Sequence, residues 1–153
     1  MQRFFSDYWD ILQRHHAAIE RALDGLSQEA LDWSPAPEVN AIGVLAAHII
    51  GSERYWISDV VAQISTDRDR DAEFHSAGVS ADALRARLTA AARDIRAILE
   101  HLSLEQLGET RMSPRHGHEY TVGWALAHVL EHTGLHVGHM EMMRHWWEQR
   151  QED

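Results

Sequence analysis

Apolar residues recur at intervals of three and four positions along four segments of the chain, which is the period of an α-helix with one buried face. We predict helices over residues 3–23, 41–64, 81–101 and 122–149. The three prolines fall between these segments, and Ser80 stands where it can cap the third helix. Four helices of this length, each with an apolar stripe, favour an all-α fold with the architecture of a four-helix bundle.

The segments between the predicted helices are longer than tight turns, which permits crossover connections. The charged connector TDRDRDAEFHSAG, residues 66–78, is expected to be flexible. Residues 111–120 are expected to form a small hairpin before the fourth helix, and no stretch alternates in the way a core strand would.

Two pairs of short segments resemble each other. GLSQEAL (25–31) is similar to HLSLEQL (101–107), and IGVLAAHII (42–50) is similar to VGWALAHVL (122–130). In the first pair a serine can cap a helical turn, and Ser103 with Gln106 fits a capping box. The repeat indicates two related halves in which His48 and His128 take equivalent positions.

Length and composition limit the classes of function. A chain of 153 residues suits a single domain, residues 1–153. The net charge of −10 disfavours nucleic acid as a partner, and no apolar run is long enough to span a bilayer. The absence of cysteine excludes disulfides and thiolate ligands, and the absence of lysine excludes Schiff-base chemistry. With no signal peptide recognisable at its start, the protein is expected to be cytoplasmic.

The chain holds 12 histidines, and five of them fall between residues 128 and 145. Histidines four apart on a helix lie about 6 Å apart along the axis and can reach one ion, whereas residues eight apart are separated by about 12 Å. His128, His132 and His136 therefore cannot share an ion, and a third ligand must come from another helix. His48, placed among apolar residues, is the strong candidate; its alternative is a buried histidine bonded to a neighbouring helix.

A second motif overlaps the first. Residues 128–132 spell H-x-x-E-H, in which His128 and His132 would bind a metal and Glu131 would act as the general base of a hydrolase. A peptide cleft is hard to build from so small a bundle, so this metallohydrolase is a minor alternative. His139, three residues after His136, is either in contact with a ligand histidine or a polar residue bonded elsewhere.

The remaining histidines and the terminal aromatic residues suggest ordinary structural roles. His15, His16, His75 and His101 show no metal spacing and are expected at the surface. The aromatic residues near the chain ends are expected in the core first and in a homodimer interface second; they are Phe4, Phe5, Tyr8, Trp9, Trp146 and Trp147.

The segments LAAHIIGSERYWI and TVGWALAHVLEHTGLHVGHMEMMR, together with ALDGLSQEALDWSPAP, resemble the DinB/YfiT-like superfamily. The resemblance implies a four-helix bundle that holds a divalent metal on His48, His132 and His136, with His128 at a non-ligating position. Val137 and His139 depart from the H-R-G-Q form of the motif and match an H-x-G-H branch.

Some members of that superfamily use mycothiol or bacillithiol in S-transfer or maleylpyruvate isomerisation. The resemblance therefore implies a metal-dependent enzyme with zinc, nickel or iron, acting on a low-molecular-weight thiol and a small molecule. Glu131 and His139 are candidates for orienting the ligands. The alternatives are a non-catalytic, stress-related metal-binding bundle and a bundle that binds no metal.

Overall fold

The computed structural model describes residues 1–150, and its four long helices are the ones that the apolar periodicity predicts. Shorter elements occupy the connections between them. In chain order the elements are α1 (Arg3–Leu23), α2 (Gln28–Asp32), α3 (Ile42–Arg54), the π-helical segment η1 (Tyr55–Val61), α4 (Arg70–Glu73), α5 (Ala81–His101), the 3₁₀ segment η2 (Leu104–Gly108), β1 (Thr110–Ser113), β2 (His118–Thr121) and α6 (Val122–Arg150).

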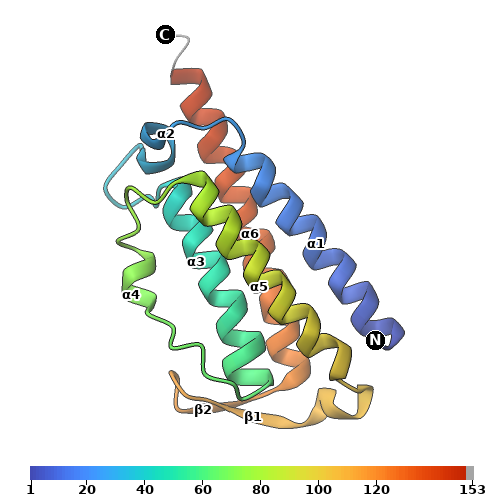
Figure 1. Ribbon diagram of the computed structural model, residues 1–153. Helices are drawn as coiled ribbons and strands as arrows, with labels where there is room; N and C mark the ends of the chain where they lie inside the picture. The colour runs from blue at the N-terminus through green and yellow to red at the C-terminus, as the bar shows by residue number, and fades with distance from the viewer. Residues whose placement is uncertain (151–153) are drawn as a thin grey trace.

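The long helices form a bundle in which α6 packs against α1 and α3, and α5 packs against the same two helices. As Figure 1 shows, α1 and α6 run in one direction and α3 and α5 in the other. The connection from η1 to α5 must therefore travel back along the bundle, and it passes outside α3 with α4 on its way (Figure 1). This crossover brings residues of the charged connector beside α3.

One continuous apolar core lies between the helices. Every long helix contributes fully buried side chains, each of which stabilises the fold by roughly 1.5–3 kcal/mol relative to exposure. The largest of them are Phe5, Leu12, Ile19 and Leu23 on α1, Ile42 and Ile49 on α3, and Leu84, Leu88, Ile95 and Leu99 on α5. Among residues 1–150, none of the helices has both the length and the apolar character needed to cross a membrane.

The second predicted helix changes its winding before it ends. It is α-helical through Arg54 and π-helical from Tyr55 to Val61, and every residue of the π-helical segment is buried. Asp59, within this segment, binds the start of the connector: its carboxylate accepts hydrogen bonds from the backbone N–H and the hydroxyl of Thr66, at 3.2 and 2.6 Å. The connector is thereby fixed where it leaves the helix.

The predicted hairpin and caps are confirmed. β1 and β2 pair antiparallel, with Thr110 opposite Thr121, directly before α6. The Ser80 hydroxyl accepts a hydrogen bond at the start of α5, and Ser103 and Gln106 form a capping box at η2.

The internal repeat also has a structural counterpart. Gly43 at the start of α3 packs against the Leu31 carbonyl, and Gly123 at the start of α6 packs against the Leu107 carbonyl. A Cβ at either glycine would lie 3.2 Å from that oxygen, tighter than most contacts. In each half of the chain, a glycine therefore allows a short helical turn to pack closely against the start of the following long helix.

Candidate metal centre

Three histidine side chains from two helices meet where α3 packs against α6. His48 lies on α3, and His132 and His136 lie one turn apart on α6. One ring nitrogen from each residue lies within 4.8 Å of the other two. His48 is 8% exposed, and the other two are half-buried. The three histidines that the sequence singles out are therefore neighbours, and the cluster could hold a metal ion.

A carboxylate fixes the protonation of His48. Its Nδ1 lies 3.0 Å from Glu73 Oε2, and because an ionised carboxylate only accepts, Nδ1 carries the proton. Nε2 then carries a lone pair, which can accept a hydrogen bond from His132 Nε2 at 3.0 Å or bind an ion. Two nitrogens on a tetrahedral ion with bonds of about 2.1 Å lie about 3.4 Å apart. The observed separation is close to that, so the two rings fit a shared ion.

Glu73 is held in turn by an arginine. Arg68 donates from Nε to Oε1 at 2.6 Å and from Nη2 to Oε2 at 2.8 Å. Burial alone would raise the pKa of Glu73, but the hydrogen bonds from Arg68 and His48 hold it below its ordinary value. The carboxylate is therefore ionised at neutral pH. A carboxylate behind a ligand histidine is a common support in metal sites, where it fixes the tautomer and ring orientation.

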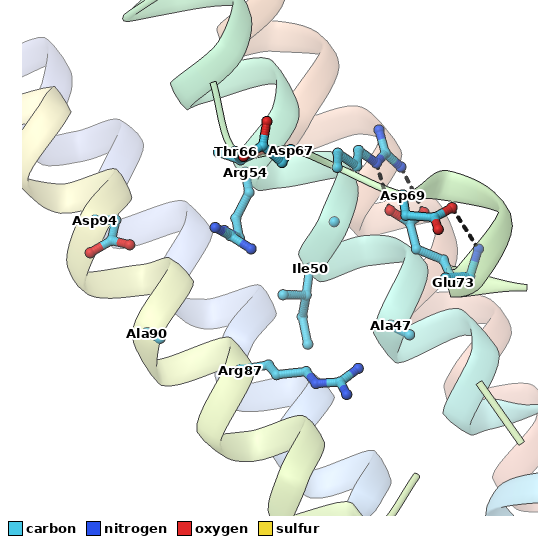
Figure 2. A pocket seen from close by; sticks show the side chains of 13 residues that line it. Ala47, Ile50, Arg54, Thr66, Asp67, Asp69, Glu73, Arg87, Ala90 and Asp94 are labelled. Atoms are coloured by element: carbon cyan, nitrogen blue, oxygen red, sulfur yellow. Dashed lines mark hydrogen bonds and ion pairs between the residues drawn. The ribbon is translucent and has the colours of Figure 1, made fainter. Parts of the chain in front are cut away.

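The connector that carries Glu73 corrects a prediction. Residues 66–78 were expected to be flexible, yet they fold against α3, with α4 capped by the Asp69 carboxylate accepting from the Ala72 N–H at 3.0 Å. Figure 2 shows Glu73 at the edge of a cavity between α3, the connector and α5. A Cβ at Gly51 would overlap the Glu73 carboxylate, so the glycine makes room for it. In the sequence, Gly51, three residues after His48, is the residue that could have indicated a side chain packed closely against this part of the helix.

The rings of His132 and His136 are neutral at pH 7. Burial, followed by the neighbouring imidazoles His136 and His48, lowers the pKa of His132 to about 3. Burial, followed by His48 and His139, lowers the pKa of His136 to about 4. Since a metal binds the neutral imidazole, both rings are ready to ligate without losing a proton first.

Comparison with known proteins agrees with the fold. The family model of the DinB superfamily matches residues 11–140. The chain belongs to the DinB superfamily. A conserved protein from Enterococcus faecalis has a similar structure at 15% identity, with a TM-score of 0.78 over 94% of this chain and 96% of that one. A DinB-like protein from Bacillus cereus is similar at 17% identity, with a TM-score of 0.71 over 90% and 91%. No curated protein matches the sequence.

In this DinB bundle, two residues of the H-x-x-E-H motif, His128 and Glu131, lie outside the triad. The Glu131 side chain is 82% exposed, and its carboxylate lies 3.8 Å from His128 Nδ1. The His128 ring stacks on Trp124, with centroids 4.9 Å apart and planes 11° apart. Within residues 1–150, the only cluster of three or more candidate ligands is the one that joins His48 to α6. The arrangement needed for the hydrolase, with Glu131 beside a metal, is absent from this part of the chain.

His139 does contact the DinB triad. It is exposed, and its Nδ1 lies 3.4 Å from Nδ1 of His136. This contact engages Nδ1, one of the two nitrogens of His136. His139 is thus placed to orient a ring of the cluster.

A second buried polar cluster was missed by the sequence. His16, expected at the surface, is 8% exposed, and its Nε2 lies 2.8 Å from Glu53 Oε2. The Thr133 hydroxyl donates to Glu53 Oε1 at 2.8 Å. Burial, and then the charge of Glu53, raises the pKa of Tyr8 well above its ordinary value. The prediction for His16 is wrong because its helix face turns inward, toward a carboxylate on α3.

The terminal aromatic residues of the DinB chain divide into two groups. Phe5, Tyr8, Trp9 and Trp147 are buried in the bundle, as expected of core residues. Phe4 and Trp146 are 45% and 41% exposed.

Proposed function

We propose that this DinB protein is a metal-dependent enzyme that activates a low-molecular-weight thiol for transfer to, or isomerisation of, a small electrophilic substrate. The observation that carries the proposal is the convergence of His48, His132 and His136 within 4.8 Å of one another. Three protein ligands are typical of catalytic zinc sites, whereas structural sites use four.

The charge of the site favours an anionic sulfur. All three ligands are neutral imidazoles, so a divalent ion bound there keeps its charge of +2. When bound, such an ion lowers the pKa of a coordinated thiol, which supplies a thiolate at neutral pH. Imidazole ligands suit zinc, nickel and iron alike, so the donor set leaves these three metals as candidates.

The residues of the chain act through position and charge. Glu73 keeps the proton on Nδ1 of His48, so that Nε2 would be the atom that binds an ion, and Arg68 keeps Glu73 ionised. In the transfer, the thiol gives its proton to solvent and its sulfur forms a bond to the electrophilic carbon. The leaving group departs with the bonding electron pair.

The test combines metal analysis with a transfer assay. The purified protein, loaded separately with zinc, nickel and iron, is supplied with mycothiol or bacillithiol and a neutral electrophile, and thioether formation is followed. We expect transfer that disappears on chelation and returns with one of the metals. Stoichiometric metal without transfer would favour the non-catalytic bundle, and a protein that takes up no metal would refute both.

A further inference from the structure

A cavity of about 350 Å³ opens directly beside the triad. It lies between the last turns of α6 and the linker that precedes α3, and His136 is one of its walls. Among the principal cavities of residues 1–150, it is the one that a triad histidine lines. A molecule held in it would lie against one ring of the candidate metal centre.

The cavity is lined mainly by apolar side chains. Leu45 and Met143 are buried and form its inner surface, whereas Val39, Met142 and Trp146 keep between 37% and 52% of their surface exposed. Large apolar side chains are normally covered in a protein, and thioethers beside an indole make a soft surface that adapts to flat ligands. The exposure of three such residues around one hollow indicates that something apolar covers them.

The polar residues of the cavity limit the charge of its ligand. Glu38 is the one carboxylate in the lining, which contains no arginine; the other polar members are Asn40, His136 and His139. An anionic ligand would find no cation here except at the metal, and would meet the charge of Glu38. The volume lies near the lower end of the range of small-molecule sites, too small for a folded partner.

We propose that this cavity binds the body of the electrophile, and that the substrate is a neutral, apolar molecule with an aromatic or branched aliphatic group. This inference rests on the proposed function, in which the sulfur is activated at the triad. The body packs on Met142 and Trp146, and its electrophilic carbon lies toward His136. The hydrophobic contacts then select the substrate, while the triad supplies the chemistry.

Binding is tested without turnover, by nuclear magnetic resonance of the methionine methyl groups in the metal-loaded protein. The probe is 1,3-dinitrobenzene, a neutral aromatic molecule without a leaving group. We expect the methyl signals of Met142 and Met143 to shift as the probe is added. Met112, which is 46% exposed on the hairpin, is the internal control and should stay in place. Equal shifts at Met112, or none at Met142, would overturn the proposal.

Selectivity is tested with two neutral electrophiles in the thiol-transfer assay, the aromatic 1-chloro-2,4-dinitrobenzene and the small, polar iodoacetamide. In Trp146→Ala we expect KM for the aromatic electrophile to rise about tenfold through loss of the aromatic contact, and KM for iodoacetamide to change little. Met142→Gln should act in the same direction. Trp124→Ala is the matched control, since Trp124 lies on the same helix and is 45% exposed.

The outcomes separate the two proposals. Methyl shifts without any transfer would refute the thiol-transfer function and keep the apolar site. Transfer that is equally insensitive to Trp146→Ala and Trp124→Ala, with no shift at Met142, would refute the site and keep the function. A dimer that dissociates in Trp146→Ala, with Met142 signals that follow protein concentration alone, would assign the cavity to contact between copies and overturn the proposal.

Discussion

Two histidine–carboxylate pairs are buried in this bundle, and they differ in what surrounds them. His48 Nδ1 lies 3.0 Å from Glu73, and His16 Nε2 lies 2.8 Å from Glu53. In the first pair, the second nitrogen of the ring faces another imidazole, that of His132. The second pair is not part of a cluster of three candidate metal ligands among residues 1–150.

In the pair around Glu53, both carboxylate oxygens are hydrogen-bonded to neighbouring side chains. The Thr133 hydroxyl takes the other carboxylate oxygen, so that His16 on α1, Glu53 on α3 and Thr133 on α6 join three helices. A buried histidine–carboxylate pair is therefore not by itself a sign of a metal site. The distinguishing feature is a free ring nitrogen that meets further ligands, as at His48.

The largest effect is expected from removing a triad ligand. His136→Ala should abolish stoichiometric metal binding, because two imidazoles remain and the loss exceeds the roughly 10–100-fold cost of losing an outer partner. His128→Ala, one turn outside the cluster, should keep the metal. Elemental analysis of both variants beside the wild type checks this. Retention in both would refute the triad, and loss only in His128→Ala would restore the H-x-x-E-H alternative.

Breaking the His16–Glu53 pair should lower the stability of the fold and leave metal binding intact. His16→Ala leaves a buried carboxylate oxygen of Glu53 without its hydrogen-bond partner, which typically costs about 1–3 kcal/mol in the free energy of unfolding. Chemical denaturation measures this, with His101→Ala, an exposed position on α5, as the control. If His16→Ala lost its metal while still folded, the conclusion that the His16–Glu53 pair is structural and separate from the metal site would be wrong.

Breaking the His48–Glu73 pair should reduce metal affinity. Glu73→Gln should weaken it by about 10–100-fold through loss of the support behind His48. It should also lower the free energy of unfolding, because the buried Arg68 guanidinium loses its carboxylate. Competition with a metallochromic chelator measures the affinity. Asp71→Asn, an exposed carboxylate on the same short helix, is the matched control. Equal affinities in the two variants would remove Glu73 from the site.

The smallest effect is expected from pH. In the metal-free protein, the pKa values of His132 and His136, about 3 and about 4, lie below the ordinary 6.5. The unfolded chain therefore binds more protons between about pH 4 and 6.5, and stability should fall as pH is lowered through that window. Thermal unfolding at pH 7 and pH 5 measures this. The double variant His132→Gln, His136→Gln should show a smaller difference between the two pH values; an unchanged difference would place the titrating groups elsewhere.

The long helices could be predicted because helical periodicity and capping are local properties. The spacing of His132 and His136 is local in the same way, since four residues on a helix bring two rings to one side. His48 was a candidate because it interrupts an apolar stretch, but its place beside His132 and His136 depends on the packing of α3 on α6, between residues far apart in sequence. His16 was misjudged for a related reason: a histidine inside an apolar stripe is compatible with burial only when a partner exists, and Glu53 is 37 residues away.

The four long helices, their caps and the pair of histidines on α6 follow from local sequence, because each depends on residues within a few turns of one another. The contact between Glu73 and His48, by contrast, is a property of the tertiary structure. That contact requires the crossover connector to fold back along α3 and a glycine at position 51 to admit the carboxylate. The hydrogen bonds from Arg68 and His48 outweigh burial and hold the pKa of Glu73 below its ordinary value. The ionised carboxylate keeps the proton of His48 on Nδ1, so that Nε2 faces His132.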